Sequence, residues 1–166
     1  MNIAIFAAGC FWGVEKKFDL TKGVNKVEVG YTGGKIQNPT YEQVCYEDTG
    51  HAEAVRINFD DKIITYKELL NVFWSCHNPT TLNRQGPDIG EQYRSAIFYL
   101  DDKQKTEAED SKRKMNKTIF NNNIMTEITK FDVFYLAEEY HQKYLKKLEN
   151  INVFSHNRLV RKKSFK

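Results

Sequence analysis

Residues 9–13 read Gly9-Cys10-Phe11-Trp12-Gly13, and they join a short apolar run at residues 2–8 to a segment at residues 11–20 with the apolar spacing of a helix. The run predicts a strand, so Cys10 stands at a strand-to-helix junction with its sulfur directed at unpaired backbone N–H groups. Because the helix dipole there favours the thiolate over the thiol, we expect a reactive cysteine. The flanking glycines permit a sharp turn and the close approach of another molecule. The alternative interpretation is a cysteine buried in a core strand.

The length and charge of the chain favour one domain. With 166 residues, of which 40% are apolar, the chain can bury a core, and we expect one domain over residues 1–149 followed by a basic tail at residues 150–166. The formal net charge is only +3, which argues against a nucleic-acid or a membrane partner. The N-terminal apolar run resembles a lipoprotein leader, but it is short and no Lys or Arg precedes it. We therefore expect neither a secretory leader nor a transmembrane helix.

The cysteines indicate a reducing compartment. Cys10, Cys45 and Cys76 are an odd number and lie far apart, whereas small secreted domains usually hold an even number in disulfides. No Cys or His pair has zinc-finger spacing, so we expect no metal site. The simplest interpretation is a cytoplasmic enzyme with one working thiol.

The remaining pattern predicts a mixture of strands and helices. Further strands are expected at residues 27–31, 51–59, 93–100 and 124–135, and further helices at residues 65–77, 101–117 and 137–149. Thr65 and Glu68 form a capping box at the start of one of these helices. Residues 78–92 contain two prolines and two glycines with little periodicity, which predicts a long functional loop. Strands and helices do not alternate strictly, which favours an α+β fold with a mostly antiparallel sheet and helices packed on it.

Glu53 is the second residue with a distinctive position. In a strand at residues 51–59 side chains alternate, so Glu53 shares one face with Val55, Ile57 and Phe59. A carboxyl group among large apolar side chains is partly desolvated, which raises its pKa and lets it keep a proton near neutral pH. The alternative is a glutamate at a strand end whose carboxylate reaches water.

The GCFWG motif at residues 9–13 resembles the active-site motif of the A-type peptide methionine sulfoxide reductases (the MsrA family). Later segments resemble that family's further blocks in the same order, namely GG (33–34), NPTYEQVC (38–45), TGHAEAV (49–55), NRQGPDIG (83–90), QYRS (92–95) and YHQKY (140–144). The resemblance covers roughly residues 3–148. It implies a two-layer α+β sandwich with a ferredoxin-like core.

The resemblance also implies a reaction, in which the S epimer of methionine sulfoxide, free or in oxidised proteins, is reduced to methionine without a cofactor. Oxide is a very poor leaving group, so the oxygen must be protonated or hydrogen-bonded while a nucleophile attacks the sulfur. By resemblance Cys10 attacks and becomes a sulfenic acid, and Glu53 supplies the proton. The phenols of Tyr41 and Tyr93 donate hydrogen bonds to the oxygen, because they stay protonated at neutral pH.

The same resemblance assigns the substrate pocket and the partners. Phe11 and Trp12 match the pocket for the substrate methyl group, where aromatic faces stabilise the positive charge that develops on sulfur. Asp88 matches a residue on the polar side of the site, with Arg84 or Arg94 as a candidate ion-pair partner. We expect a monomer that reacts with a thioredoxin or glutaredoxin-type reductant and binds neither nucleic acid nor a membrane.

Recycling of the sulfenic acid is the point at which this chain departs from many family members. Those members carry resolving cysteines in a Gly-rich C-terminal tail, whereas here no cysteine follows Cys76, and residues 150–166 contain five Lys or Arg and no acid. The resolving thiol must therefore be Cys45, Cys76 or an external thiol. Cys45 lies four residues after Tyr41, about one helical turn away, which permits a resolving role. We favour the interpretation that Cys45 is a packed core thiol.

Two other functions are compatible with parts of the sequence. A cysteine acyltransferase or protease would use Cys10 with His51 or His141 as its base. A binding module would use the basic tail to contact nucleic acid.

Overall fold

The computed structural model describes the backbone of residues 2–163 and the side chains of residues 2–153. The elements in chain order are β1 (Asn2–Ala8), α1 (Phe11–Asp19), β2 (Val24–Thr32), α2 (Tyr41–Tyr46), β3 (Ala52–Phe59), α3 (Tyr66–Ser75), β4 (Arg84–Gln85), β5 (Asp88–Ile89), η1 (Glu91–Tyr93), β6 (Ser95–Tyr99), α4 (Asp102–Thr118), β7 (Glu127–Lys130), β8 (Phe134–Leu136), η2 (Glu139–His141) and α5 (Tyr144–Lys163). The strand and helix predicted on either side of Cys10 are therefore confirmed.

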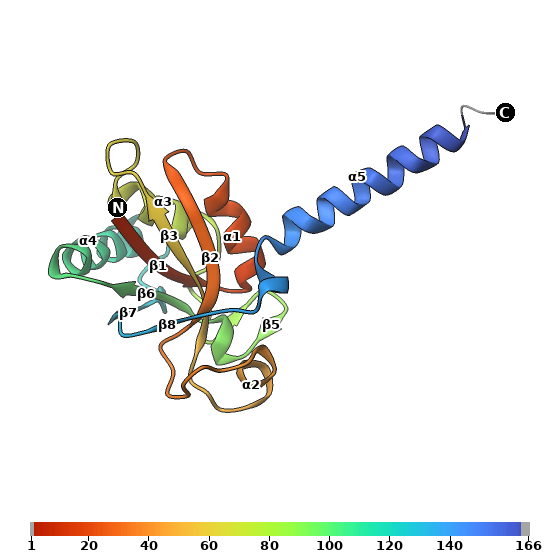
Figure 1. Ribbon diagram of the computed structural model, residues 1–166. Coiled ribbons are helices and arrows are strands. Elements are labelled where there is room, and N and C mark those ends of the chain that lie inside the picture. The colour runs from red at the N-terminus through yellow and green to blue at the C-terminus, as the bar shows by residue number, and fades with distance from the viewer. Residues whose placement is uncertain (1, 164–166) are drawn as a thin grey trace.

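A six-stranded sheet with the order β7-β6-β1-β3-β2-β8 forms the centre of the molecule (Figure 1). The pairs β1–β3, β1–β6, β2–β3 and β2–β8 are antiparallel, whereas β7 joins β6 in parallel, so the sheet is mixed. The predicted α+β class is confirmed. The more specific prediction of a two-layer, ferredoxin-like core stays a prediction.

The single strand predicted at residues 124–135 is wrong. That segment forms β7 at one edge of the sheet and β8 at the opposite edge. The link between them crosses one face of the sheet, where Phe131 and Phe134 pack on a small apolar cluster that includes Phe98. A run of residues that favour strands is compatible both with one long strand and with two strands joined by a short link.

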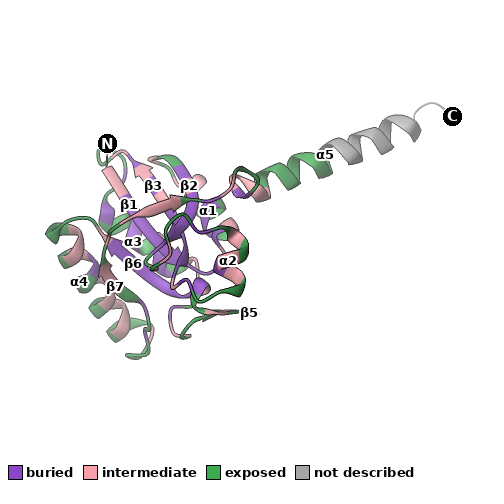
Figure 2. Ribbon diagram, turned by 60° about the horizontal axis from the view of Figure 1, so that its bottom comes forward, coloured by how far each residue is buried: buried purple, intermediate pink, exposed green. Residues whose placement is uncertain are grey.

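Alternating residues of β1 divide the core between the two faces of the sheet. Ala4, Phe6 and Ala8 belong to the larger cluster, to which α1, α3 and α4 contribute, whereas Ile5 and Ala7 belong to the smaller one. Figure 2 shows the central strands buried and the outer faces of the helices exposed. The three helices thus cover one face of the sheet. Packing in this cluster holds α1, and with it the junction at Cys10, in place.

Local capping explains two of the helices. The predicted capping box at α3 is confirmed, since Thr65 Oγ1 accepts from Glu68 N at 3.2 Å and Glu68 Oε2 accepts from Thr65 N at 2.7 Å. The α4 helix starts after its N-cap Asp101, and Ala108 is its one buried residue. The charged face of α4 is therefore solvated.

The helix predicted at residues 137–149 is broken into two parts. A short 3-10 turn, η2, ends at His141, and α5 starts at Tyr144 after Lys143, whose φ of +56° no α-helix accommodates. Tyr140 and Leu148 are 57% and 40% exposed. The α5 helix runs away from the body of the molecule (Figure 1) and continues through the predicted boundary at residue 150.

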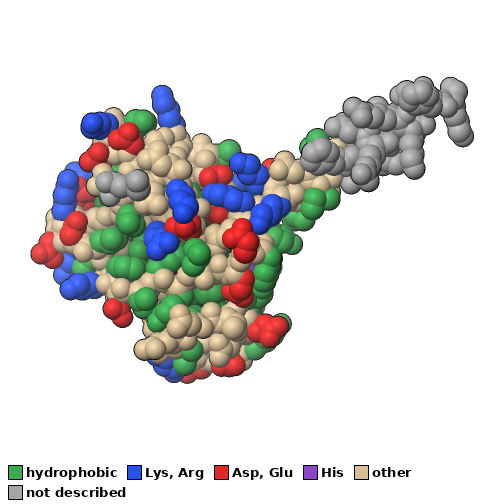
Figure 3. Space-filling view, in the orientation of Figure 1, with side chains coloured by type: hydrophobic (Ala, Val, Ile, Leu, Met, Phe, Trp, Pro, Cys, Tyr) green, Lys and Arg blue, Asp and Glu red, His purple; other side chains and the backbone are tan. Residues whose placement is uncertain are grey.

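The surface carries both signs of charge. Figure 3 shows Lys and Arg interspersed with Asp and Glu on the visible face. The sequence holds nearly equal numbers of the two kinds, 25 and 22. Within residues 2–163, no helix has the length and apolarity that crossing a membrane would need.

Candidate active site

The strand-to-helix junction is fixed by a glycine and a glutamine. Gly9 has a φ of +95°, and a Cβ at this position would lie 2.6 Å from Cγ of Gln85. The Gln85 amide is held in turn by Asn78, accepting from its N–H at 3.0 Å and donating to its carbonyl at 2.8 Å. Glycine is therefore required before Cys10, and the predicted loop at residues 78–92 packs directly against the junction.

Cys10 is the N-cap of α1 and is half-buried. Burial raises the pKa of its thiol to about 11, and the carboxylates of Glu53 and Asp88 add to the rise, whereas the N–H groups of Trp12 and Gly13 lower it. The expectation of a favoured thiolate is therefore wrong, because desolvation and two acidic neighbours outweigh two backbone donors. Gly13 has open space where a side chain would stand, since a Cβ there would meet nothing within 4 Å.

Glu53 lies inside the core on β3 and is 1% exposed. Its Oε2 accepts a hydrogen bond from the backbone N–H of Phe11 at 3.0 Å, which brings it to the residue after Cys10. Burial raises the pKa of Glu53 to about 7; the bond from Phe11 opposes this rise and the charge of Asp88 adds to it. The predicted shared face with Val55 and Ile57 and the raised pKa are both confirmed.

Two half-buried tyrosines lie within electrostatic range of this carboxyl group, Tyr41 at the start of α2 and Tyr93 at the end of η1. Burial raises the pKa of Tyr93 to about 12, and the charges of Glu53, Cys45 and Cys10 contribute. Burial also raises the pKa of Tyr41, with further contributions from its hydrogen bond to Cys45 and from Glu53. Both phenols therefore stay protonated at neutral pH and can donate hydrogen bonds.

Asp88 lies in β5, on the hairpin that β4 and β5 form within the predicted loop. Neither arginine suggested for it is its partner in the described structure. Arg84 donates to the carbonyl of Gly86 at 2.9 Å, and Arg94 pairs with Glu127 at 3.3 Å. Asp88 therefore adds negative charge near Cys10 without a paired cation among these groups.

The aromatic side of the site is held by the C-terminal segment. The Trp12 Nε1–H donates to Nδ1 of His141 at 3.0 Å, and the Trp12 ring stacks on Tyr144 with a centroid distance of 4.0 Å. Phe11 is 1% exposed and packs against Tyr31 and His141 at 5.8 and 5.2 Å. Trp12 is thus the accessible ring, and Phe11 lies behind it.

Sequence reasoning assigned no role in the site to Glu138 or Tyr144, and it named His141 only as a candidate base for Cys10. Glu138 accepts from the Tyr31 hydroxyl at 3.0 Å and from the Tyr41 backbone N–H at 3.1 Å, and so it ties α2 to the sheet. The YHQKY block was a signal for His141 and Tyr144. No pattern in the sequence pointed to Glu138.

The two other cysteines have different surroundings. Cys45 lies on α2, four residues after Tyr41, and is half-buried. Burial raises the pKa of Cys45, and the hydrogen bond with Tyr41 opposes the rise. Cys76 caps α3 and donates to the carbonyl of Phe73 at 3.2 Å, which indicates a structural thiol.

The histidines do not supply a base for Cys10. His51 is buried, with Nδ1 accepting from Gly34 N at 3.1 Å and Nε2 donating to the Ile36 carbonyl at 2.7 Å. His141 uses Nδ1 to accept from the Trp12 indole. Since neither imidazole hydrogen-bonds Cys10 in the part of the chain that is described, the geometry argues against an acyltransferase or protease.

The similarity to known proteins extends over the whole chain. The family model described as peptide methionine sulfoxide reductase matches residues 2–166. A peptide methionine sulfoxide reductase MsrA of Methanosarcina acetivorans is 57% identical over 152 residues, which are 89% of this chain and 81% of the relative.

Solved structures show the same fold. Mxr1 from Saccharomyces cerevisiae in reduced form superposes with a TM-score of 0.84 at 38% identity, covering 88% of this chain and 84% of Mxr1. Mxr1 in complex with Trx2 superposes with a TM-score of 0.63 at 28% identity, covering 86% of this chain and 84% of that one.

Proposed function

The chain belongs to the peptide methionine sulfoxide reductase family, and we propose that Cys10 and Glu53 are the reacting pair of its site. The protein reduces the S epimer of methionine sulfoxide to methionine by thiol chemistry. One observation carries the residue assignment: a buried carboxyl group with a pKa of about 7 is hydrogen-bonded to the backbone of the residue that follows the thiol.

The reaction needs a proton for the sulfoxide oxygen as that oxygen leaves the substrate sulfur. The Cys10 sulfur attacks the sulfoxide sulfur, and the S–O bond breaks as two electrons pass from the cysteine to the substrate. Thiol and sulfoxide thereby become sulfenic acid and thioether without net gain or loss of protons. With a pKa of about 7, Glu53 is present in both forms at neutral pH, so it can give a proton to the oxygen and take one from the thiol.

The phenols of Tyr41 and Tyr93 act on the same oxygen. Both stay protonated, and both lie within electrostatic reach of Glu53. Donors that are already oriented toward the oxygen stabilise the charge that develops there without reorganising. Asp88 would add negative charge on the polar side, close to the developing positive charge on the substrate sulfur.

Trp12 forms the apolar wall for the substrate methyl group, with Phe11 behind it. Its half-buried ring is held by His141 and Tyr144. As the oxygen is protonated the sulfur becomes cationic, and an aromatic face attracts that cation more strongly than the neutral sulfoxide. Such a contact accelerates the reaction because it strengthens in the transition state.

A single-turnover experiment tests the assignment. Reduced protein is mixed with one equivalent of either methionine sulfoxide epimer, without reductant, in the presence of a sulfenic-acid reagent. We expect methionine from the S epimer alone and the reagent on Cys10. Labelling of Cys45 or Cys76 in place of Cys10, with methionine still formed, would overturn the choice of nucleophile.

For recycling we propose an external thiol rather than an internal disulfide. One solved yeast structure is of Mxr1 in complex with Trx2, which supports a thioredoxin as the reductant here. A glutaredoxin-type thiol remains the second candidate, since an accessible sulfenic acid needs only a thiolate. Three unpaired cysteines fit a reducing cytoplasm, which we propose as the location. We further propose that the protein acts as a monomer on free or protein-bound substrate.

A further inference from the structure

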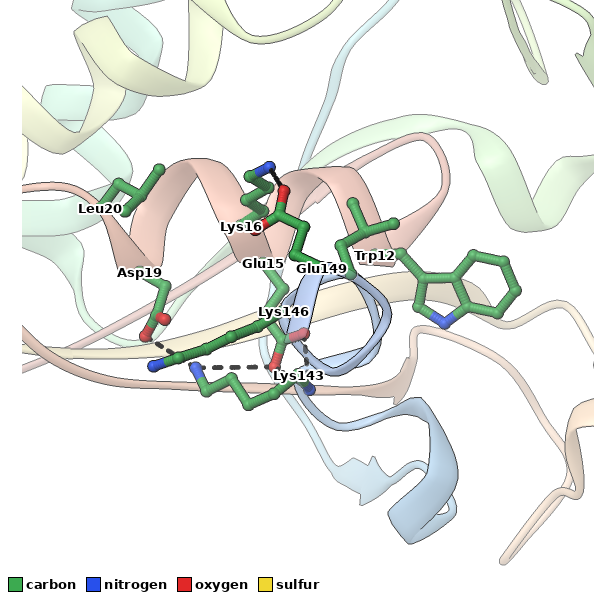
Figure 4. A pocket seen from close by; sticks show the side chains of 9 residues that line it. Trp12, Glu15, Lys16, Asp19, Leu20, Lys143, Lys146 and Glu149 are labelled. Carbon is green, nitrogen blue, oxygen red and sulfur yellow. Dashed lines mark hydrogen bonds and ion pairs between the residues drawn. The ribbon is translucent and has the colours of Figure 1, made fainter. Parts of the chain in front are cut away.

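A carboxylate is buried one helical turn after Trp12. Glu15 is 2% exposed, and both of its oxygens accept from the backbone N–H of Lys143, at 3.0 and 2.9 Å. Burying a carboxylate is costly unless it is paired and hydrogen-bonded. The Lys143 ammonium supplies the charge, with Nζ 3.6 Å from Glu15 Oε1 and 2.7 Å from Asp19 Oδ1. Figure 4 shows Lys143 reaching both carboxylates of α1.

Lys143 is the left-handed residue that separates η2 from α5. Its N–H cannot take part in a regular helix, so Glu15 provides the partner that this backbone group needs. The preceding residue is fixed from the sheet, because Gln142 Oε1 accepts from Val29 N at 3.0 Å and Gln142 Nε2 donates to Val29 O at 2.9 Å. The turn at residues 142–143 is therefore pinned by α1 on one side and by β2 on the other.

Both neighbours of this pinned turn contact Trp12. His141, directly before it, accepts the indole N–H at 3.0 Å, and Tyr144, directly after it, stacks on the ring at an interplanar angle of 19°. Trp12 and Glu15 lie three residues apart on α1, a spacing that puts them on adjoining positions of the helix surface. A cavity of about 150 Å³ beside Trp12 is lined in part by Glu15 and Lys143.

We propose that Glu15 is a positioning residue for the sulfoxide site: by holding the Lys143 turn, it sets His141 and Tyr144 against Trp12 and so fixes the apolar wall. The inference rests on the proposed role of Trp12 in binding the substrate methyl group. Glu15 touches neither substrate nor sulfur. It acts through the backbone of Lys143, and the Lys143 side chain supplies the countercharge for Glu15 and Asp19.

The test measures the Trp12 environment and the kinetics separately. The chain has two tryptophans, so a Trp74→Phe background isolates the emission of Trp12. In this background Glu15→Leu should make Trp12 more accessible to acrylamide quenching. It should also lower kcat/KM about tenfold, mostly through KM, as expected when a charge-assisted hydrogen bond is lost. Glu15→Gln keeps one acceptor oxygen and should lower kcat/KM by only about twofold to threefold.

Two further variants serve as controls. Lys143→Arg keeps the backbone N–H and the positive charge beside Glu15 and Asp19, so it should keep quenching and kcat/KM near the wild-type values. Glu149→Gln removes a carboxylate that lines the same cavity but pairs with Lys16, and it should change neither quantity.

The outcomes separate this inference from the proposed function. Wild-type quenching in both Glu15→Leu and Glu15→Gln would overturn the positioning role, even if Trp12→Ala impairs turnover. Increased quenching with an unchanged kcat/KM would overturn it as well. Wild-type kinetics in Trp12→Ala would show that the proposed methyl site is wrong, and the inference would fall with it. Should Glu15→Leu not fold, the comparison of Glu15→Gln with Glu149→Gln decides.

Discussion

The backbone N–H of Phe11 donates to Glu53 Oε2 at 3.0 Å, although the two residues are 42 positions apart in the sequence. Phe11 follows the proposed nucleophile directly and starts α1, so the same helix N-terminus that presents Cys10 also holds the proposed acid. The bond lowers the pKa of Glu53 against the larger effect of burial. The proposed nucleophile and the proposed acid are therefore coupled through one peptide unit, and a substitution at either should change the pKa of the other.

Replacing the nucleophile should abolish the reaction without unfolding the protein. Cys10→Ser is close to isosteric, but its hydroxyl has no accessible anion, so we expect no methionine in a single turnover. Cys45→Ser and Cys76→Ser should retain the first turnover. The measurement is methionine released per protein, with circular dichroism as the control for folding. Full activity in Cys10→Ser would refute the mechanism.

Removing the acid should slow the sulfoxide step. Glu53→Gln keeps the shape of the side chain but cannot transfer a proton, so we expect a fall of roughly 10²–10⁴-fold in the rate of sulfenic acid formation. Regeneration by a thiol should be little affected. Glu109→Gln, on the solvated face of α4, is the matched control and should react at the wild-type rate. Sulfenic acid forming at the wild-type rate in Glu53→Gln would exclude Glu53 as the donor.

The raised pKa of Glu53 predicts a pH dependence of stability. The pKa rises from its ordinary value of 4.5 to about 7, mainly through burial, so the folded state favours the protonated form. This contribution is fully present below pH 4.5 and is lost as the pH rises through 7. Between these limits the free energy of unfolding should fall by roughly 3 kcal/mol through this group.

Urea denaturation of wild-type protein and Glu53→Gln, at a series of pH values, measures that contribution. The difference in free energy of unfolding between wild type and Glu53→Gln should change across the window from pH 4.5 to 7. A difference that stays constant over this range would mean that Glu53 ionises normally in the folded protein.

Trp12→Ala should weaken both binding and rate. It removes the methyl contact and the aromatic face beside the cationic sulfur, which together are worth about 2 kcal/mol, or roughly 30-fold in kcat/KM. Trp12→Phe keeps a ring and should recover part of kcat, but it lacks the N–H that His141 accepts. Steady-state kinetics with methionine S-sulfoxide provide the test, and equal losses in Ala and Phe variants would argue against a ring-dependent effect.

Counting thiols distinguishes the recycling routes. Reduced enzyme is treated with one equivalent of methionine sulfoxide without a reductant. Two free thiols per chain, with Cys10 trapped as its sulfenic acid, are expected for external recycling. One free thiol and a Cys10–Cys45 peptide in the mass spectrum would instead show an internal bridge, which requires Cα atoms within about 7 Å.

The sequence by itself determined the features that depend on local chemistry. The strand-to-helix junction at Cys10 and the capping box at Thr65 follow from neighbouring residues, because backbone propensity and caps act over one turn. The buried face that Glu53 shares with Val55 and Ile57 follows from the two-residue period of a strand. Burial alone then gave the correct direction for the pKa of Glu53.

Tertiary structure decided everything that depends on which distant segments meet. The break of the last predicted helix at Lys143 requires Glu15, more than a hundred residues away, to accept its N–H. The fate of residues 124–135 depended on two opposite sheet edges that no local pattern identifies. The pKa of Cys10 rose rather than fell, because burial and the acidic side chains brought to it outweigh the helix N-terminus, and long-range packing alone sets those distances.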